Sequence, residues 1–257
     1  IVQAARVSYG EGTKTVNEDR GLIRYLLRHN HSTPLEMVVL KLHCKMPVFV
    51  ARQWIRHRAS SYNEISARYS IMKDEFYFPF ASDFRKQSTT NRQGGAEELD
   101  FLTATKFVNS IIDESDEAYQ IYMNMIDSGM SREQARMILP LNLYTEWYWK
   151  IDLHNLFHFL GLRADSHAQK EIQVYANAII ELLRQVVPVA VEAWEDYHPM
   201  RGAIKLTRLE VEALSNFIKQ NAWQAAAPQI TTDNKREQAE WLKKAKLLGI
   251  NIPEQQP

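Results

Sequence analysis

The 257-residue sequence has almost no cysteine, no net charge and no long apolar run. Its single cysteine, Cys44, excludes a disulfide within the chain and is typical of a reducing compartment. No apolar run approaches the roughly 20 residues that are needed to cross a bilayer. The start also lacks a secretory signal, and Ile1 is not an initiator methionine, so we expect a trimmed N-terminus and a cytoplasmic protein.

The lack of net charge narrows the range of partners. Lys plus Arg and Asp plus Glu both number 31, so no global field draws the surface onto nucleic acid or an anionic membrane. Hydrophobic residues make up 45% and aromatic residues 11% of the chain, which is the composition of a folded globular protein. A chain of this length can bury a substantial core in one large domain.

Most of the chain has the pattern of helices. Apolar residues three and four positions apart predict helices over residues 19–28, 48–55, 101–127, 131–139, 152–160 and 166–187. Thr33 and Ser166 are each followed three residues later by Glu or Gln, which indicates capping boxes. Asp152 can cap the helix that follows it, and Gly129 can end a helix in the left-handed conformation.

Two segments have the pattern of strands. Residues 40–46 alternate between apolar and polar side chains, and residues 141–149 are rich in aromatic and β-favouring side chains. The alternation places Cys44 on the core side, which favours a small buried residue over a nucleophile. The polar residues 60–63 and the polar segment 83–97 are expected to form exposed loops.

These elements predict the α+β class. We expect a single helix-rich domain around a small mixed or antiparallel sheet. That domain spans residues 1–197, and residues 198–257 form a helical extension of unknown role.

Arginines cluster in one part of an otherwise neutral chain. Arg52, Arg56, Arg58 and Arg68 face a single acid, Glu64, between residues 51 and 70. Guanidinium groups bind phosphate through two parallel hydrogen bonds, which suggests a nucleotide pocket. Solvated or salt-bridged arginines at a helix end explain the cluster equally well. The spacing alone favours neither interpretation.

A longer pattern includes part of this cluster. Arg56-His57-Arg58 is followed after seven residues by Ser66, with Asn63 and Arg68 in register. The pattern resembles the signature of the flavin-dependent thymidylate synthases. Other segments resemble landmarks of the same family: Ala5-Arg6-Val7-Ser8, His31 with Thr33-Pro34, Leu139-Pro140-Leu141-Asn142, Leu162-Arg163 and Ser166-His167-Ala168-Gln169. The resemblance covers roughly residues 1–197.

The resemblance implies an enzyme of de novo dTMP biosynthesis. It implies a homotetramer whose sites are shared between subunits and hold a tightly bound FAD beside dUMP. NADPH reduces the flavin, 5,10-methylenetetrahydrofolate delivers one carbon to carbon 5 of the uracil, and flavin hydride completes the methyl group. This chemistry needs no cysteine nucleophile and no metal, and it implies no nucleic-acid or membrane partner.

The resemblance also implies which residues contact the substrate. The dUMP contacts are Gln53, Trp54, Ile55, Arg56, Glu64, Ile65, Ser66, Ala67, Arg68, Arg136 and Arg163. Arg163 is the expected catalytic residue, because a fixed cation stabilises the negative charge that develops on the uracil ring. Ser66 is expected to bind near the base and not to act as a nucleophile, since the flavin chemistry requires no general base beside it.

The implied flavin contacts come from both halves of the chain. They are His31, Thr33, Arg56, His57, Arg58, Glu64, Asp152, Leu153, His154 and His158. The sequence departs from the family at three of them, because many members have Asn at the Asp152 and His158 positions and Arg at the His154 position. Asp152 also has a purely structural interpretation as an N-cap.

Two other classes of protein fit parts of the pattern. His154 and His158 are four residues apart on one helix face, and with Asp165 and His167 they are compatible with a metallohydrolase. The zinc-protease pattern requires Glu after the first histidine, where this chain has Asn155. The arginine cluster with Tyr62 and Tyr69 is compatible with a nucleic-acid-binding module, although a neutral chain argues against it.

Overall fold

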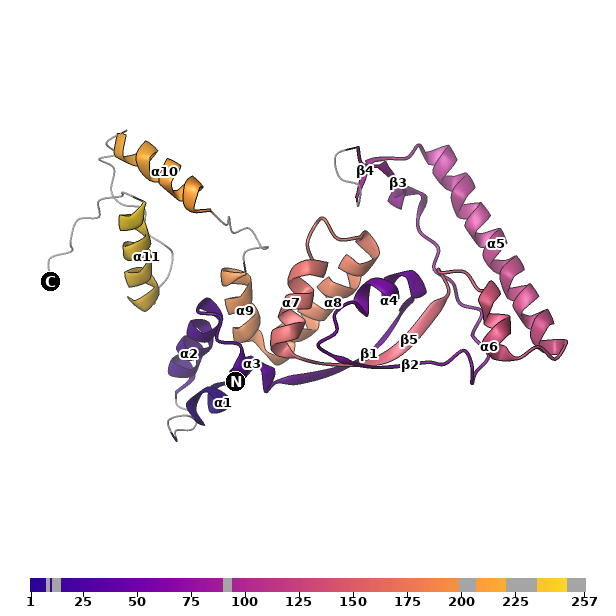
Figure 1. Ribbon diagram of the computed structural model, residues 1–257, viewed down its shortest axis with the longest axis horizontal. Helices are drawn as coiled ribbons and strands as arrows, with labels where there is room; N and C mark the ends of the chain where they lie inside the picture. Colours follow the sequence, from indigo (N-terminus) through magenta and orange to yellow (C-terminus); the bar gives the residue numbers. More distant parts are fainter. Residues whose placement is uncertain (8–9, 11–14, 90–93, 199–206, 221–234, 249–257) are drawn as a thin grey trace.

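The structure is a computed structural model that describes residues 1–257 except 8–9, 11–14, 90–93, 199–206, 221–234 and 249–257 (Figure 1). Its central sheet has three strands in the order β1-β5-β2, and both pairs are antiparallel. Its strands are β1 (Val39–Pro47), β5 (Tyr144–Asp152) and β2 (Ser61–Glu64). The predicted α+β class with a small antiparallel sheet is confirmed.

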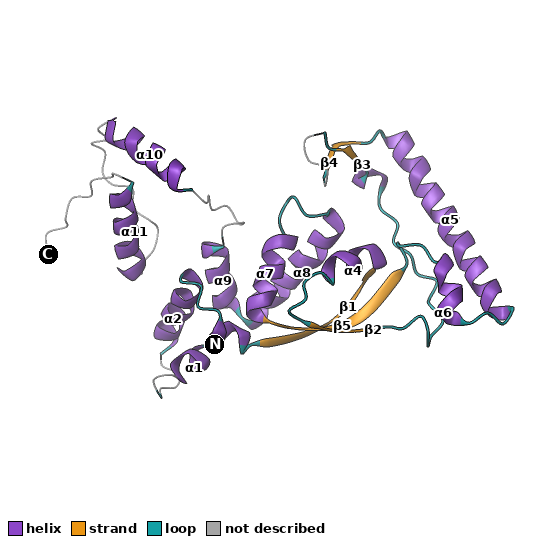
Figure 2. Ribbon diagram, in the orientation of Figure 1, coloured by secondary structure: helices purple, strands orange, loops and turns teal. Residues whose placement is uncertain are grey.

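Helices cover one face of this sheet (Figure 2). They are α4 (Val48–Trp54), α7 (Leu153–Arg163) and α8 (Lys170–Val186). Trp54 of α4 is fully buried, with its ring centroid 5.8 Å from that of Trp147 and 5.0 Å from that of Trp149 on β5. Large aromatic side chains contribute the most apolar area to a core, so this cluster anchors the helices on the sheet.

The alternation predicted for residues 40–46 is confirmed. Met46 is buried and Leu42 and Cys44 pack partly buried against the core, whereas Lys41 and Lys45 are exposed. Burial raises the pKa of the Cys44 thiol to about 11, so the thiol stays protonated and is a poor nucleophile at neutral pH.

The remaining elements surround this centre. The N-terminal side has α1 (Val2–Arg6), α2 (Val16–Arg28) and α3 (Thr33–Glu36), with α9 (Pro188–Tyr197) packed on α2. The other side has the long α5 (Phe101–Asp127), α6 (Arg132–Ala135) and the 3-10 turns η2 (Ala81–Asp83) and η3 (Arg136–Ile138). Two helices, α10 (Arg208–Gln220) and α11 (Lys235–Leu247), lie in the C-terminal extension. Within the described ranges, no helix is both long and apolar enough to cross a membrane.

Two predicted helix boundaries are confirmed. The Asp152 side chain accepts a hydrogen bond from the Asn155 main-chain nitrogen at 2.9 Å and so caps α7. Gly129 follows the end of α5 with φ of +90°, a left-handed conformation that glycine adopts without steric cost.

Other local predictions are wrong. The polar residues 60–63 do not form a loop, because residues from Ser61 onward pair with β5 as strand β2. The segment 83–97 is not simply a loop, since β3 (Arg85–Gln87) and β4 (Gly95–Glu98) form an antiparallel pair within it. The helix expected from Ser166 begins later, at Lys170, with no side-chain cap. Likewise, α3 includes Thr33, and Ser32 takes the N-cap position instead.

Candidate active site

The first group of predicted site residues gathers where α4 ends and β2 begins. Arg163, the last residue of α7, donates from Nε to Nε2 of His57 at 3.0 Å and from Nη2 to the main-chain oxygen of Gln53 at 3.5 Å. The Gln53 side chain hydrogen-bonds the side chain of Gln169, which precedes α8. The main-chain oxygen of His57 accepts the Tyr62 hydroxyl of β2 at 2.9 Å. The guanidinium of Arg163 therefore joins α7 to the end of α4, and Gln53 joins α4 to the start of α8.

The electrostatics of this group favour a fixed cation beside a neutral imidazole. Burial, together with the charge of Arg163 and the neighbouring His158, lowers the pKa of His57 to about 4. Nε2 of His57 is therefore free to accept the Arg163 hydrogen bond at neutral pH. Arg163 is half-buried and forms no ion pair with any acid that the structure describes. Such a cation can stabilise negative charge on a ligand.

The arginines of the basic cluster separate into two kinds. Arg52, Arg56 and Arg58 are exposed, and none of them forms an ion pair with another described residue. Arg68 instead pairs with Glu133, with 3.0 Å between Nε and Oε2. Arg68 is therefore salt-bridged when no ligand is bound, whereas Arg52, Arg56 and Arg58 have guanidinium groups that no described acid occupies.

The second group of predicted residues lies beyond the other end of β2. The Glu64 carboxylate accepts the Thr145 hydroxyl of β5 at 2.6 Å. Glu133 of α6 connects two arginines, since its carboxylate accepts from Arg68 and its main-chain oxygen accepts from Arg136 Nε at 3.2 Å. Ser66 lies between these contacts and accepts the Arg68 main-chain N–H at 3.3 Å.

The two groups are not brought together within one chain. Strand β2 has four residues, Ser61–Glu64, and therefore spans roughly 10 Å between them. Gln53, His57 and Arg163 lie at its first end, and Ser66, Arg68 and Arg136 lie beyond its second. The predicted dUMP contacts thus form two half-sites at opposite ends of one strand.

The predicted flavin contacts follow the exposed side of α7. His154 and His158 are exposed one turn apart, and the His158 ring centroid lies 6.1 Å from that of His57. At the start of α7, the main-chain nitrogen of Leu153 donates to the Val38 oxygen at 2.8 Å, which ties α7 to the corner between α3 and β1. The exposed Thr33 lies on α3, so residues from both halves of the chain meet here.

Several predicted contacts have their side chains committed elsewhere. The side chains of Trp54 and Leu153 are fully buried in the core, so only their main-chain atoms can reach a ligand. Both oxygens of Asp152 bond Asn155, at 2.9 Å to its main-chain nitrogen and 2.7 Å to its side-chain nitrogen. The structural interpretation of Asp152 as an N-cap is therefore confirmed. Ile55, in contrast to Trp54 and Leu153, is 40% exposed.

Comparison with known proteins identifies the family. Residues 1–189 match the model of the Thy1 family, described as thymidylate synthase complementing protein. The chain belongs to this family. Relatives named flavin-dependent thymidylate synthase include proteins from Dictyostelium discoideum, 56% identical over 98% of this chain and 78% of the relative, and Thermus thermophilus, 54% identical over 88% of this chain and 81% of the relative. The resemblance inferred from Arg56-His57-Arg58 and Ser66 is confirmed.

Solved structures support the same assignment. The UMP/dUMP methylase PolB from Streptomyces cacaoi, solved with 5-Br dUMP, superposes with a TM-score of 0.70 at 31% identity. The match covers 79% of this chain and 91% of PolB. The chain is accordingly placed among the flavin-dependent thymidylate synthases, which are flavoenzymes.

The residues around His57 fit the flavin cofactor of this synthase. A flavin dinucleotide carries two phosphates, and the exposed Arg56 and Arg58 provide guanidinium groups that no described acid neutralises. The imidazoles of His154 and His158 provide further hydrogen-bonding groups on the adjacent side of α7. Arg56, Arg58, His154 and His158 would therefore hold the phosphates and the polar edges of the cofactor.

Some residues of the two competing interpretations have partners within the chain. Asp165 is occupied by His167, with 2.8 Å between Oδ1 and Nδ1, and no three potential ligands are grouped for a metal in the described part of the chain. For the nucleic-acid-binding module, Tyr62 is half-buried with its ring 4.9 Å from that of Trp147, so it is not available to stack on a base.

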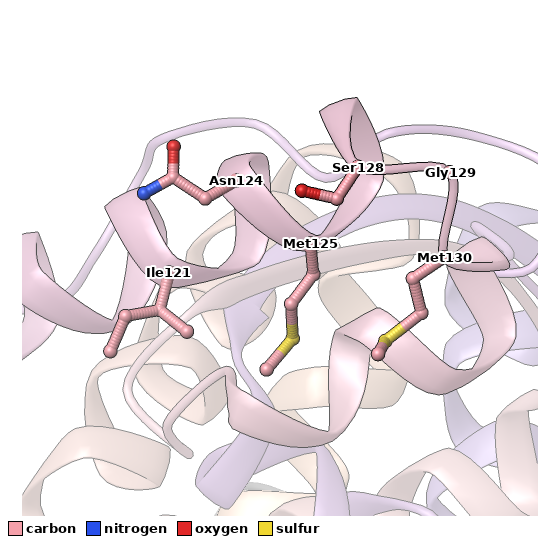
Figure 3. Close-up of a pocket in the computed structure, with 6 residues that line it drawn as sticks. All are labelled: Ile121, Asn124, Met125, Ser128, Gly129 and Met130. Atoms are coloured by element: carbon pink, nitrogen blue, oxygen red, sulfur yellow. The ribbon is translucent and has the colours of Figure 1, made fainter.

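A hollow elsewhere on the synthase does not belong to this site. It has a volume of about 560 Å³ and lies where α5 ends (Figure 3), lined by Ile121, Asn124, Met125, Ser128, Gly129 and Met130. None of these is a predicted dUMP or flavin contact.

Sequence reasoning missed the partners that hold the site residues. Thr145, Glu133 and Tyr62 hydrogen-bond Glu64, Arg68 and the His57 main chain, respectively. Their residue types carry no signal by themselves, since each partner comes from a distant element. Gln169 belongs to a predicted cap and to the Ser166-His167-Ala168-Gln169 landmark, and neither pattern indicates that its side chain bonds Gln53.

Proposed function

We propose that this chain converts dUMP to dTMP by reductive methylation, with Arg163 as the catalytic residue. The observation that carries the proposal is the half-buried Arg163 guanidinium, which His57 and the Gln53 carbonyl hold in place. Arg56 and Arg58 lie close to His57 in the chain and pair with no acid that the structure describes. The carbon donor is 5,10-methylenetetrahydrofolate, and bound FAD, reduced by NADPH, supplies the hydride.

The chain itself contributes charge and orientation. Arg163 stabilises the negative charge that develops on the uracil ring when carbon 5 becomes nucleophilic, and its two hydrogen bonds fix its direction before the substrate arrives. Because Nε2 of His57 already accepts from Arg163, the imidazole keeps the guanidinium in one orientation without competing for its charge.

The remaining dUMP contacts follow from the two half-sites. Gln53 and the main chain of Trp54 and Ile55 contribute from the first, and Glu64, Ile65, Ser66, Ala67, Arg68 and Arg136 from the second. Arg68 and Arg136 bind the phosphate, which takes the place of Glu133 as their acceptor. Ser66 binds near the base. His31, Thr33, His57 and Glu64 join the arginines and histidines named above as flavin contacts.

We further propose that a second copy of the chain completes each site, in a homotetramer. The predicted contacts of one nucleotide are divided between the two ends of β2 in one chain, so a neighbouring copy can supply one of the two half-sites. Large apolar side chains beside the second half-site are exposed, among them Met137 at 78% and Leu141 at 64%. Apolar exposure of this extent marks surfaces that partners cover. Light scattering during gel filtration tests this, and a monomeric active enzyme would contradict it.

The single thiol supports a cytoplasmic location.

The visible spectrum of the purified protein tests the proposed function most directly. We expect flavin bands that bleach when NADPH is added, and dUMP-dependent formation of dTMP with methylenetetrahydrofolate. A colourless protein that takes up no added FAD would overturn the proposal.

A further inference from the structure

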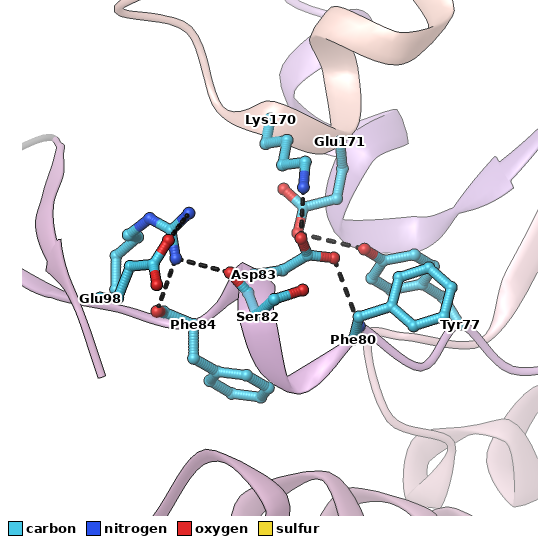
Figure 4. Close-up of polar contacts among 9 residues, drawn as sticks. Tyr77, Phe80, Ser82, Asp83, Phe84, Glu98, Lys170 and Glu171 are labelled. Carbon is cyan, nitrogen blue, oxygen red and sulfur yellow. Dashed lines mark hydrogen bonds and ion pairs between the residues drawn. The ribbon is translucent and has the colours of Figure 1, made fainter. Parts of the chain in front are cut away.

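Residues 77–83 lie against the first turn of α8, where Tyr77 and Asp83 face Lys170 and Glu171 (Figure 4). Asp83 forms an ion pair with Lys170, the first residue of α8. The Tyr77 hydroxyl donates to Oε1 of Glu171 at 3.4 Å. The Asp83 side chain is only 11% exposed, whereas Lys170 is 63% exposed, so the carboxylate is the fixed partner of the pair.

Asn142 anchors the start of the segment, and a bond within the segment braces its last turn. At its start, the Tyr77 main-chain nitrogen donates to the Asn142 oxygen at 2.9 Å, and Nδ2 of Asn142 donates back to the Tyr77 oxygen at 3.2 Å. At its end, Oδ2 of Asp83 accepts the Phe80 main-chain N–H at 3.3 Å. A segment fixed in this way can act as a rigid support.

The segment contacts residues that neighbour Gln53 in the predicted dUMP site. The Tyr77 ring lies 5.7 Å from the ring of Phe49, which is one helical turn before Gln53 on the same face of α4. On the other side, Lys170 follows Gln169, whose side chain bonds Gln53. The Gln53 carbonyl in turn accepts from Arg163. Residues 77–83 therefore support both sides of Gln53.

The first turn of α8 needs such a support. Its N-cap residue, Gln169, makes no side-chain capping bond, and uncapped helix ends fray readily. Burial, with the Glu171 charge as a second cause, raises the pKa of Tyr77 above its usual range, so its hydroxyl stays protonated and donates to Glu171.

We propose that Tyr77 and Asp83 are positioning residues for dUMP binding, because they hold the first turn of α8 where Gln169 orients Gln53. The inference rests on the proposed function, in which Gln53 contacts dUMP. Neither residue touches the substrate, so their loss changes the affinity for dUMP and leaves flavin binding intact.

The central test is Lys170→Glu, which places a carboxylate against Asp83. We expect the KM for dUMP to rise about fivefold, the change that corresponds to losing a partly exposed ion pair, with kcat within about twofold. Adding Asp83→Asn should restore the KM, because asparagine still accepts the Phe80 N–H and no longer repels the new carboxylate. Tyr77→Phe, which keeps the ring on Phe49, should raise the KM about threefold.

The matched control is Lys86→Glu. Lys86 pairs with Glu97 in the strand pair β3–β4, so this substitution makes the same change of charge at a site away from α8. Its KM should equal that of the wild type. Any one of three results overturns the positioning role. The KM for dUMP is unchanged in Lys170→Glu and Tyr77→Phe, or it rises equally in the control. Alternatively, adding Asp83→Asn to Lys170→Glu does not restore the KM. Flavin content and Tm show whether each variant is folded. A wild type without dUMP-dependent turnover overturns the proposed function instead.

Discussion

Replacing Arg163 with alanine removes the one guanidinium that the structure fixes at the first half-site. The side chain makes two hydrogen bonds, at 3.0 Å to His57 and 3.5 Å to the Gln53 oxygen, so its position is set before substrate binds. Loss of one preorganised donor where charge develops costs about 3–4 kcal/mol, or a 100- to 1000-fold slower reaction. We therefore expect at least a 100-fold loss of tritium release from dUMP labelled at carbon 5.

Flavin content separates a catalytic role from a structural one. Removing Arg163 leaves Nε2 of His57 and the Gln53 oxygen without this donor, which should cost about 1–2 kcal/mol of folding stability. The unpaired Arg56 and Arg58 remain, so the variant should retain its FAD. Arg184→Ala is the matched control, because Arg184 pairs with Glu195 on the surface, with 2.7 Å between Nη2 and Oε1.

The outcome is decisive in either direction. Normal tritium release from a flavin-loaded Arg163→Ala enzyme would refute the catalytic role and the reasoning from charge stabilisation. If the variant loses both its flavin and its tritium release, the guanidinium instead holds the cofactor site together.

Three further predictions follow from the same contacts. The pKa of His57 is lowered from 6.5 to about 4, so its contribution to stability is complete above pH 6.5 and is lost as the pH falls to about 4. Because the ring is only half-buried, we expect this contribution to the free energy of unfolding to be about 1 kcal/mol. Between these pH values, the stability measured by urea unfolding should therefore fall less for His57→Gln than for the wild type. Equal falls would contradict this prediction. Asp152→Ala removes the cap of α7 and should cost about 1 kcal/mol in urea unfolding, which unchanged stability would disprove. Cys44→Ala should keep the wild-type turnover, since the thiol pKa of about 11 leaves it protonated, and an inactive folded variant would overturn that view.

Features set by neighbours along the chain could be predicted from the sequence. The alternation at residues 40–46, the Asp152 cap and the left-handed Gly129 depend on contacts within a few residues, and all three are confirmed. The family was also identifiable, because Arg56-His57-Arg58 with Ser66 is a local spacing.

The tertiary structure decided whatever depends on residues far apart in the chain. Residues 61–64 are too polar to indicate a strand, and they form one because β5 offers its free edge to their main-chain groups. Arg68 resembles Arg56 and Arg58 in sequence, but among the residues that the structure describes only Arg68 meets a carboxylate, which comes from Glu133 of α6. Periodicity cannot show either of these contacts.

The sequence by itself determined the family, the chemistry of the residues and most helices, because these follow from residue type and short spacing. Only the tertiary structure placed Arg163 against His57 and put Ser66 and Arg136 at the opposite end of β2. The physical reason is that the direction of each chain segment is set by the packing of helices and strands, and residue spacing carries no information about it. The separation of the predicted nucleotide contacts into two groups at opposite ends of β2 is a property of the fold.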